Sequence, residues 1–424
     1  MSDGRVSRRA FVSAVGAGLT GLAVSGLAGC AATLRGDIAP KTGRRVVVVG
    51  GGWAGATAAK YVRLEDPSIE VILLEPNRQF VSCPFSNLVV SGVWTIERLT
   101  FGYDGLRRHG VRIIHEAATA IEPDRKRVRI GEGYLEYDRL IVAPGIDFQW
   151  DQIEGLPEAK DTIVHAWKAG PQTVALARQL QSMPDGGVFV LTVPPVAYRC
   201  PPGPYERACQ VAWYLKHHKP RSKLIVLDGN NGIVSKPGLF QAAWRDYPNL
   251  EYQPTSRIVK FDASSRTVTT AIGDPVKYDV LNLIPPQRAG AIAVQADLVG
   301  PDGRWCEVNH VTFESVKQRN IHVIGDATVG LPVPKSGTIA NATGKICATA
   351  VVHLLNGKEP PLIPPLNICY SWVNDREAMA VINAYRIQGG KVVQIEQKLT
   401  PGQSTRWGQN AVAWATSIWS DILG

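Results

Sequence analysis

The 424-residue chain lacks the short cysteine motifs that mark metal and haem sites. It has seven cysteines but no Cys-x-x-Cys pair and no Cys-x-x-Cys-His motif, so neither a zinc site nor covalent c-type haem is expected. It also lacks a lysine- or arginine-rich block, although its net charge is +9. Without a recognised binding motif beside that charge, we expect no nucleic-acid partner.

A second glycine-rich nucleotide turn is missing as well. The stretch from residue 186 to 228 reads as strand, turn and helix, then a second strand, which is the usual frame of such a site. Its turn is VPPVAYRCPPGPYERA, and Gly203 is the only glycine in it. Prolines remove backbone N–H donors and block close approach of a ligand. We therefore expect no nicotinamide nucleotide at this turn.

The first thirty residues have the character of an export signal. Arg8 and Arg9, in SRRAF, precede a weakly apolar Gly/Ala-rich segment, which resembles a twin-arginine signal peptide spanning residues 1–30. A membrane anchor is the alternative. The sequence LAGC ending at Cys30 resembles a lipoprotein box, so Cys30 is either lipidated or removed by ordinary cleavage. We predict a periplasmic protein, with a possible lipid tether.

The segment after the signal has the pattern of a dinucleotide-binding βαβ unit. Four valines precede a G-x-G-x-x-G motif made by Gly50, Gly52 and Gly55, and Glu75 ends the next predicted strand. Gly50 permits the tight turn, Gly52 lets backbone approach a pyrophosphate, and Gly55 lets helix pack on strand. Glu75 can accept hydrogen bonds from a ribose. This acid does not distinguish FAD from NAD.

Two later segments resemble the FAD motifs of two-dinucleotide flavoproteins. Residues 137–145, YDRLIVAPG, look like the strand and turn that end at Gly145 and close the FAD domain. Residues 321–327, IHVIGDA, look like the second FAD motif, with Gly325 and Asp326 beside the flavin. The resemblance implies FAD and an α/β fold similar to glutathione reductase.

That fold consists of two Rossmann-like domains and a small C-terminal domain. We expect an FAD-binding domain at residues 43–150 and 280–356, a second Rossmann-like domain without a nicotinamide site at 151–279, and the C-terminal domain at 357–424.

Cys200 lies just before a predicted helix, inside the proline-rich turn. A helix N-terminus stabilises a thiolate, and Arg199 and Arg207 add positive charge nearby. Glu206 could take a proton from a sulfur substrate. A buried structural thiol is the alternative, and these residues alone do not decide between the two.

Three motifs together resemble one family. RCPPGPYERA at 199–208, the GGGxxGATAAKY pattern at 50–61 and NICYS at 367–371 are similar to the flavoprotein subunit of flavocytochrome c sulfide dehydrogenase. That family is related to sulfide:quinone oxidoreductases. The resemblance runs from about residue 44 to the end of the chain.

The resemblance implies roles for four residues and a partner. Cys200 and Cys369 match a redox disulfide that sulfide would attack, and Glu206 matches a proton acceptor near it. Cys83 matches a cysteine that binds FAD through a thioether; the alternative is a buried thiol. A separate c-type cytochrome subunit is the expected electron acceptor. The competing hypotheses are a membrane-tethered sulfide:quinone oxidoreductase-like enzyme and a non-catalytic FAD-binding accessory protein.

The remaining residues that we singled out are expected to be structural. We interpret Cys209 and Cys306 as packing or incidental thiols and Cys347 as a core residue. We interpret Lys335 as a solvated loop lysine, with a place in the lining of the flavin pocket as the alternative. Helical spacing of Trp407, Trp414 and Trp419 predicts a core face, with an exposed patch for a partner as the alternative.

Overall fold

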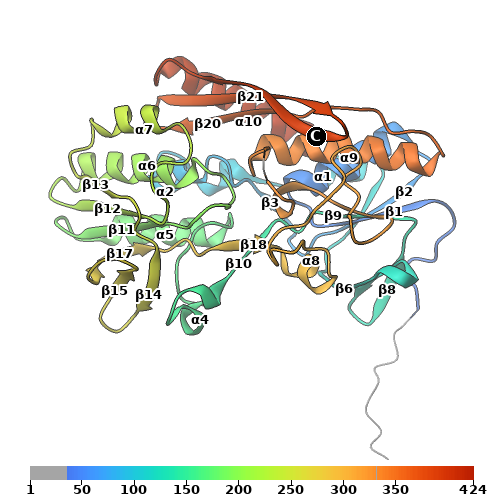
Figure 1. The fold of residues 1–424 in the computed structure, drawn as a ribbon, viewed down its shortest axis with the longest axis horizontal. Helices are drawn as coiled ribbons and strands as arrows, with labels where there is room; N and C mark the ends of the chain where they lie inside the picture. Colours follow the sequence, from blue (N-terminus) through green and yellow to red (C-terminus); the bar gives the residue numbers. More distant parts are fainter. Residues whose placement is uncertain (1–35, 331) are drawn as a thin grey trace, which may run out of the picture.

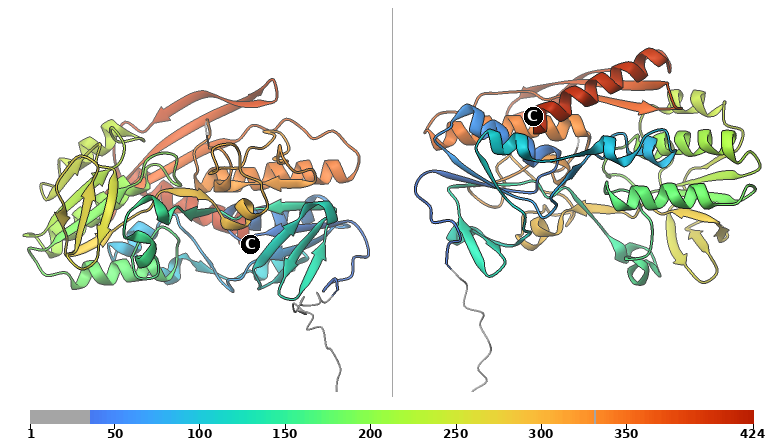
Figure 2. Two further views of the ribbon diagram at one scale, coloured as in Figure 1. Left: turned by 60° about the horizontal axis from the view of Figure 1, so that its bottom comes forward. Right: turned by 180° about the vertical axis from the view of Figure 1, so that it is seen from behind.

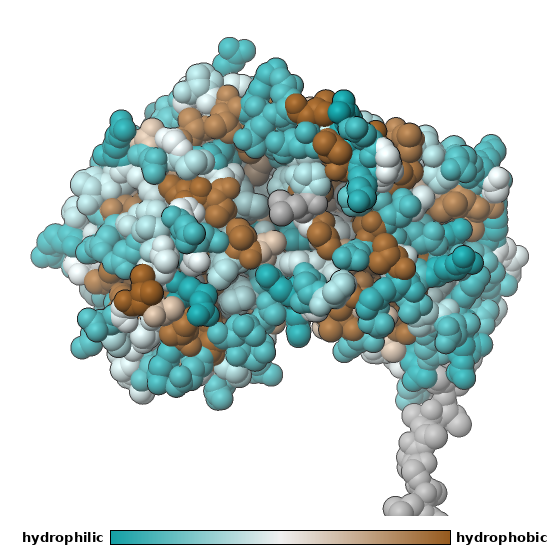
Figure 3. Space-filling view, in the orientation of Figure 1, coloured by the Kyte–Doolittle hydropathy of each residue, from teal (hydrophilic) through white to brown (hydrophobic). Residues whose placement is uncertain are grey.

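The computed structural model of the protein describes residues 36–330 and 332–424. The predicted signal peptide, with Arg8, Arg9 and Cys30, lies outside the described residues. Figure 1 shows two lobes side by side, with the C-terminal strands and helix lying across the top of both. On the face seen in Figure 3, apolar side chains are dispersed among polar ones, and a notch separates the two lobes at the lower edge.

The first lobe is built on a five-stranded parallel sheet with the order β19-β9-β1-β2-β5. Its strands are buried on both faces, which explains the continuous apolar runs such as RVVVV in β1. Two long helices, α1 and α9, pack against each other over this sheet. The bounds are β1 Arg45–Val49, β2 Glu70–Leu74, β5 Val111–Ile114, β9 Arg139–Val142, β19 Ile321–Val323, α1 Trp53–Glu65 and α9 Gly337–Leu355.

Among the described residues, α9 is the one helix long and apolar enough to cross a membrane by length and composition. Of its most apolar window, 61% is buried inside the protein, against α1 and the C-terminal strand β20. We therefore interpret α9 as a core helix of the first lobe. Cys347 is fully buried within it, which confirms its predicted packing role.

The second lobe is built on a four-stranded parallel sheet with the order β13-β12-β11-β17. Because β17 completes this sheet, the domain boundary predicted at residue 280 lies one strand too early. Cys209 is fully buried on α6, as expected. The bounds are β11 Val188–Val193, β12 Lys223–Asp228, β13 Leu250–Gln253, β17 Val280–Asn282, α5 Pro171–Ser182, α6 Gly203–His218 and α7 Pro237–Trp244.

The two lobes are joined by a two-stranded antiparallel ribbon. β10 (Ile146–Phe148) leaves the first lobe and pairs with β18 (Gln287–Ala289), which returns to it (Figure 1). The chain therefore crosses between the lobes twice at one place. The loop after β18 leads to Cys306, which is buried as predicted.

The C-terminal segment is an antiparallel sheet followed by a helix. The strands β20 (Leu366–Trp372), β21 (Ala378–Gln388) and β22 (Lys391–Leu399) pair in sequence order, and α10 (Thr405–Leu423) packs behind them (Figure 2).

The tryptophans of α10 form the predicted core face. Trp414 stacks on Trp53 with ring centroids 6.0 Å apart, and Trp419 is buried and donates to Ser82 Oγ at 3.0 Å. Trp407 packs against the same hydrophobic cluster. These contacts fasten the C-terminal helix to the first lobe, so the helix holds the C-terminal sheet in place.

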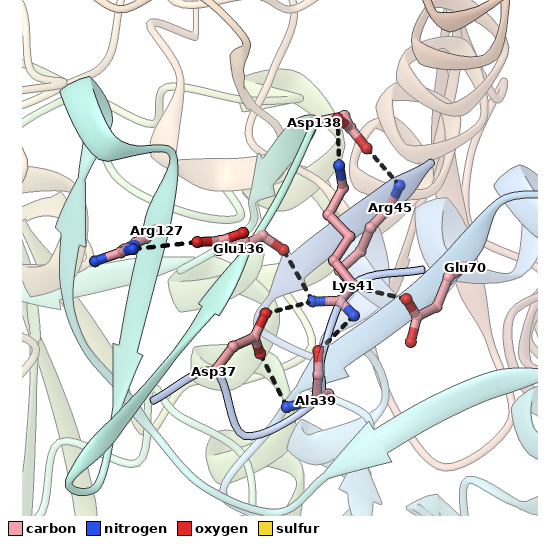
Figure 4. A network of polar contacts seen from close by, with 8 residues as sticks. All are labelled: Asp37, Ala39, Lys41, Arg45, Glu70, Arg127, Glu136 and Asp138. Carbon is pink, nitrogen blue, oxygen red and sulfur yellow. Dashed lines mark hydrogen bonds and ion pairs between the residues drawn. The ribbon is translucent and has the colours of Figure 1, made fainter. Parts of the chain in front are cut away.

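A buried arginine ties the start of the first sheet to its surroundings (Figure 4). The Arg45 guanidinium is fully buried and donates to Glu70 Oε2 at 2.7 Å and Asp37 Oδ2 at 3.2 Å. It also donates to the backbone oxygens of Ala39 and Glu136. The network fixes the extended segment before β1 against the neighbouring hairpin.

Short elements complete the lobes. Their bounds are β3 Phe80–Val81, β4 Thr100–Phe101, β6 Ala118–Glu122, β7 Arg127–Ile130, β8 Gly133–Glu136, β14 Ile258–Asp262, β15 Thr267–Thr270, β16 Val276–Lys277, α2 Ser86–Val90, α3 Asp104–Arg108, α4 Leu156–Ala159 and α8 Ala291–Gln295, with short 3-10 turns at Ile96–Leu99, Pro123–Arg125, Trp150–Gln152 and Gly325–Ala327.

Candidate active site

A cavity of about 360 Å³ runs from the glycine motif of the first lobe to the proline-rich turn of the second. The structure thus brings together sequence-predicted residues from five separate segments of the chain. Gly50, Gly55 and Cys369 are not among the lining residues. The predicted residues that line the cavity are Gly52, Glu75, Cys83, Gly145, Cys200, Glu206, Gly325 and Asp326.

The glycine motif has the geometry of a dinucleotide cradle. Gly50 has φ +97°, in the left-handed region that favours glycine. A Cβ on Gly55 would lie 1.8 Å from the Gly50 oxygen, so only glycine lets α1 pack this close to the turn. A Cβ on Gly52 would meet nothing within 4 Å, which leaves room for a ligand beside the backbone.

Glu75 is oriented by its neighbours at the end of β2. Its Oε2 accepts from the Gly51 N–H at 2.7 Å, and its Oε1 accepts from the Asn77 N–H at 2.8 Å. The Tyr103 hydroxyl donates to the Gly51 oxygen at 3.2 Å. The carboxylate is therefore held at the cavity wall, where a ribose of a bound dinucleotide would be recognised.

The unpaired polar groups of the cavity fit such a ligand. No side chain caps the N-terminus of α1, so its first N–H groups are available to a pyrophosphate. The indole N–H groups of Trp53 and Trp167, two residues of the lining, are buried and have no hydrogen-bond partner in the part of the chain that the structure describes. A bound dinucleotide offers acceptors for these donors.

The far end of the cavity holds a cluster of buried and partly buried charges. Gly325 has φ +70° and places Asp326 within the electrostatic reach of Arg199 and Lys335. Burial raises the pKa of Asp326, and the two cations oppose that shift. The cluster gives this end of the cavity fixed charges of both signs.

Lys335 differs from its prediction. It is buried rather than solvated, because its ammonium group donates to the backbone oxygens of Asp326, at 3.0 Å, and Thr328. It also lies over the Trp305 ring, 3.6 Å from the centroid. Burial lowers the pKa of Lys335 to about 8.

Cys83 lies on the cavity wall, in the turn that precedes α2. Its backbone oxygen accepts from the Ser86 N–H at 3.1 Å, and Phe85 adopts φ +74° in the same turn. The Arg199 guanidinium is close enough to its sulfur to interact with it electrostatically. For Arg199, burial acts to lower the pKa, but Cys83, Asp326 and Cys200 together outweigh it and raise that pKa. The cysteine predicted to bind FAD therefore faces the cavity next to a partly buried cation.

The proline-rich turn fixes the position of Cys200. This residue adopts φ +57°, its N–H donates to the Lys335 oxygen at 2.7 Å, and its oxygen accepts from the Gly203 N–H at 2.8 Å. A Cβ on Gly203 would lie 2.9 Å from Cys200 Sγ and 2.8 Å from the Trp167 ring. Glycine at 203 therefore allows the sulfur to sit directly before α6.

Cys369 reaches Cys200 from the C-terminal sheet. It pairs with Val381 across β20 and β21, and its thiol donates to the Tyr370 oxygen at 3.9 Å. Both cysteines are free thiols in this structure, and they are close enough to influence each other's ionisation. The Cys200 thiol, then the charge of Lys236, lower the pKa of Cys369 to about 6 against the effect of burial. Interaction with Cys369 and burial raise the pKa of Cys200.

Glu206 lies in the first turn of α6, next to the cysteine pair. It is 6% exposed. Burial raises the pKa of Glu206 to about 8, and negative charge on Cys369 adds to that shift. Lys236 and hydrogen bonds from Asn87 and the Trp372 N–H only partly offset it. A carboxyl group of this kind exchanges a proton near neutral pH.

Arg207 mainly organises the cavity wall. It donates to Asn87 Oδ1 at 2.9 Å, Asn282 Oδ1 at 2.8 Å and the Ala166 oxygen at 2.8 Å, and it lies 4.9 Å from the centre of the Trp167 ring. Burial lowers the pKa of Arg207 to about 10. Arg207 interacts electrostatically with Cys200, as predicted, but it interacts with Glu206 and Cys83 as well.

The second lobe has its nucleotide positions filled by its own side chains. At the end of β12, Asp228 is fully buried and accepts from the hydroxyls of Tyr205 and Tyr252, each at 2.8 Å. Pro195 packs 3.1 Å from where a Gly229 Cβ would stand. The acid and the turn that would bind a second dinucleotide are thus engaged within the protein.

Sequence reasoning missed Asn87 and Lys236. Asn87 links Arg207 to the Gly203 oxygen. Lys236 immediately precedes α7, and its Nζ donates to Ser371 Oγ at 2.9 Å. An amide and a lysine in surface-like loop sequences carry no signal of burial, because contacts with distant segments decide it.

Three family profiles match the chain. Residues 173–285 match the central domain of the sulfide dehydrogenase (flavocytochrome c) flavoprotein chain, and residues 363–423 match the flavin-binding domain of flavocytochrome c sulphide dehydrogenase. Residues 44–182 match the pyridine nucleotide-disulphide oxidoreductase domain. The predicted α/β flavoprotein fold and its FAD cofactor are thereby confirmed.

Individual proteins agree with these profiles. The chain is 65% identical to the sulfide dehydrogenase (flavocytochrome c) flavoprotein chain of Chlorobaculum thiosulfatiphilum over 46 residues, which are 11% of this chain and 96% of that sequence. It is 24% identical to the mitochondrial sulfide:quinone oxidoreductase of Dictyostelium discoideum over 340 residues, 77% of this chain and 73% of that one.

A solved structure shares the fold. The sulfide:quinone oxidoreductase of Aquifex aeolicus superimposes with a TM-score of 0.75 at 17% identity, covering 90% of this chain and 91% of that chain. This likeness extends over both lobes and the C-terminal segment.

The raised pKa of Glu206 predicts a pH-dependent stability. The folded protein holds this proton up to about pH 8, whereas the unfolded chain releases it near pH 4.5. Stability therefore falls as the pH rises from about 5 to 8. In the Glu206→Gln variant, which has no proton to lose, this fall should be smaller by about 2–4 kcal/mol.

Urea unfolding of the reduced protein at pH 5 and pH 8 measures this difference. Glu158→Gln, on the exposed side of α4, serves as the matched control and should behave as wild type. Identical pH dependence in wild type and Glu206→Gln would contradict a protonated Glu206.

Proposed function

Because this chain belongs to the family of flavocytochrome c sulfide dehydrogenase flavoprotein chains, and is a flavin-dependent sulfide-oxidising oxidoreductase, we propose that it oxidises sulfide at a Cys200–Cys369 disulfide. The observation that carries the proposal is that the fold brings these two thiols, from different segments of the chain, close enough to influence each other's ionisation, with Cys200 in the lining of the cavity.

The cysteine pair and Glu206 perform the sulfur chemistry in this proposal. Hydrosulfide attacks one sulfur of the disulfide, the S–S bond between the cysteines breaks, and a persulfide and a thiolate result. A second hydrosulfide takes the outer sulfur of the persulfide, which leaves two reduced cysteines and a hydrodisulfide. Two electrons and one proton remain to be removed from the pair. The ionised form of Glu206 accepts the proton; because burial raises its pKa to about 8, this form becomes more abundant as the pH approaches 8.

FAD, when bound, supplies the two-electron acceptor that reformation of the disulfide requires. The glycine motif and Glu75 would hold its dinucleotide part, while Gly325, Asp326 and Lys335 lie at the flavin end of the cavity. Cys83 would bind FAD covalently through a thioether, with Arg199 beside its sulfur.

The final acceptor in this proposal is a c-type cytochrome subunit in the periplasm, reached after export by residues 1–30. A net charge of +9 on the whole chain suits an acidic partner. The alternative acceptor is a quinone, which the 24% identity to a sulfide:quinone oxidoreductase brings into consideration.

An anaerobic sulfide titration tests the disulfide chemistry. Stoichiometric sulfide should bleach the visible flavin absorbance of wild type. Cys200→Ser and Cys369→Ser should each slow bleaching by at least about a hundredfold, because neither can form the disulfide. Cys209→Ala removes a buried thiol of α6 outside the pair and should bleach like wild type. Wild-type rates in Cys369→Ser would rule out the mechanism.

Cys83→Ala tests the covalent link. Acid denaturation of wild type should leave the flavin on the protein, whereas the variant should release it, because its flavin is held by non-covalent contacts alone. Cys347→Ala, a buried cysteine away from the cavity, is the control and should retain flavin. Equal release from wild type and Cys83→Ala would remove the thioether from the proposal.

Acceptor assays distinguish the two enzyme hypotheses. Sulfide-reduced protein should reduce a c-type cytochrome at least about tenfold faster than a soluble quinone, and the rate should fall as salt screens the attraction. Stopped-flow absorbance of cytochrome and flavin measures both reactions. Faster oxidation by quinone would instead favour the membrane-tethered alternative.

A further inference from the structure

Lys236 is a buried lysine that the chemistry described above does not use. It is only 3% exposed, at the residue before α7, and it has φ +55°. A left-handed backbone is uncommon for a residue with a Cβ, and a lysine is rarely buried unless its charge is compensated. The fold holds this side chain inside despite both costs.

The ammonium group of Lys236 points at the strand that carries Cys369. It donates to Ser371 Oγ at 2.9 Å and to the Cys369 backbone oxygen at 3.3 Å. Within residues 36–330 and 332–424 it forms no salt bridge with a carboxylate. Two neutral oxygens do not neutralise a buried cation, so its charge acts on the other ionisable groups around it.

Those groups are Cys369 on β20 and Glu206 and Cys200 at the start of α6. Glu206 is mostly protonated at neutral pH, because burial raises its pKa to about 8. Burial lowers the pKa of Lys236, whereas negative charge on Cys369, Glu206 or Cys200 raises it. The anion that Lys236 can face at neutral pH is therefore a cysteine sulfur.

We propose that Lys236 is a positioning residue that keeps the negative charge of the reduced cysteine pair on Cys369. The inference rests on the proposed redox role of the pair. In the reduced site the Cys200 and Cys369 sulfurs influence each other's ionisation, and the Lys236 ammonium group, which donates to the Cys369 backbone oxygen, compensates a negative charge on Cys369.

This placement also selects the leaving sulfur when the disulfide is opened. A thiol leaves faster the lower its pKa is. Hydrosulfide therefore bonds to Cys200 Sγ while the Cys200–Cys369 bond breaks, and the electron pair of that bond stays on Cys369 as its thiolate. The proton of hydrosulfide remains on the new persulfide of Cys200. Cys200 lines the cavity and Cys369 does not, which agrees with this direction of attack.

Alkylation of the chemically reduced flavoprotein tests the proposal without sulfide. Limiting iodoacetamide is added anaerobically over a range of pH, and peptide mass spectrometry gives the rate at each cysteine. In wild type the pH midpoint of alkylation at Cys369 should lie below the midpoint at Cys200. In Lys236→Met the rate at Cys369 at pH 7 should fall at least about tenfold and its midpoint should move to higher pH. Lys236→Arg should restore it.

Lys398→Met is the matched control, because the Lys398 side chain on β22 is 70% exposed, and it should react like wild type. Ser371→Ala, which removes one oxygen that holds the ammonium, should give a smaller fall in the same direction and decides the question if Lys236→Met does not fold. Flavin content and thermal melting report folding of each variant.

Two results would overturn the proposal: a Lys236→Met or Ser371→Ala protein that is folded and keeps the wild-type alkylation profile, or a wild type in which the pH midpoint of alkylation at Cys200 lies below that at Cys369. If only the proposed function fails, the pattern is different: wild type shows the alkylation profile expected above, but sulfide does not bleach its flavin. After sulfide treatment, a persulfide found on the Cys200 peptide supports the direction of attack, and one on the Cys369 peptide contradicts it.

Discussion

The active site depends on where β20 is held, because this strand brings Cys369 to a cysteine of another domain. Both lobes form buried hydrogen bonds to residues of this strand. From the first lobe, Ser336 Oγ donates to Asn367 Oδ1 at 2.7 Å, and from the second lobe, Lys236 donates to Ser371. Asn367 and Ser371 flank the cysteine at equal spacing and are fully buried. If β20 shifted, these buried polar groups would lose their hydrogen-bond partners, which costs free energy. The contacts therefore fix the position of the strand and of the Cys369 sulfur.

The same burial that fixes the geometry also sets the acid–base properties of the site. A carboxyl group and an ammonium group respond to a dry environment in opposite directions, since each loses its charged form. Burial raises the pKa of Glu206 to about 8 and lowers the pKa of Lys335 to about 8. The pKa values of a carboxyl group and an ammonium group, which ordinarily lie far apart, thus both come close to neutral pH. A site that must move the protons of a sulfur substrate gains from this convergence.

What the sequence could predict follows from how local each feature is. Gly50, Gly55 and Glu75 belong to one turn and the strand beside it, so backbone geometry alone predicts their places. The meeting of Cys200 with Cys369 depends on how the C-terminal sheet docks, and no spacing rule contains it; only the family resemblance suggested the pair.

Buried lysines mark the limit of sequence reasoning. Lys335 was interpreted as solvated because loop lysines usually are, yet backbone oxygens of Asp326 and Thr328 and the Trp305 ring draw it inside. Lys236 gave no sign at all, since its partners are contributed by β20. The boundary near residue 280 was misplaced for a related reason: β17 joins the second sheet by pairing with β11, far away in the sequence.

The proline-rich turn connects the closed nucleotide position of the second lobe to the thiol chemistry of the cavity. A glycine turn would lead the chain tightly from β11 into α6 and leave the helix N-terminus open to a phosphate. Here the turn places Cys200 shortly before α6 in a left-handed backbone conformation, and the Cys200 N–H donates to the Lys335 backbone oxygen. Asp228 bonds Tyr205 of the same helix, which closes the adjoining space. Prolines at 201 and 202 are therefore compatible with a thiol at the helix N-terminus and incompatible with a nucleotide there. This one change in the backbone path thus explains both the loss of the nucleotide site and the presence of a thiol before α6.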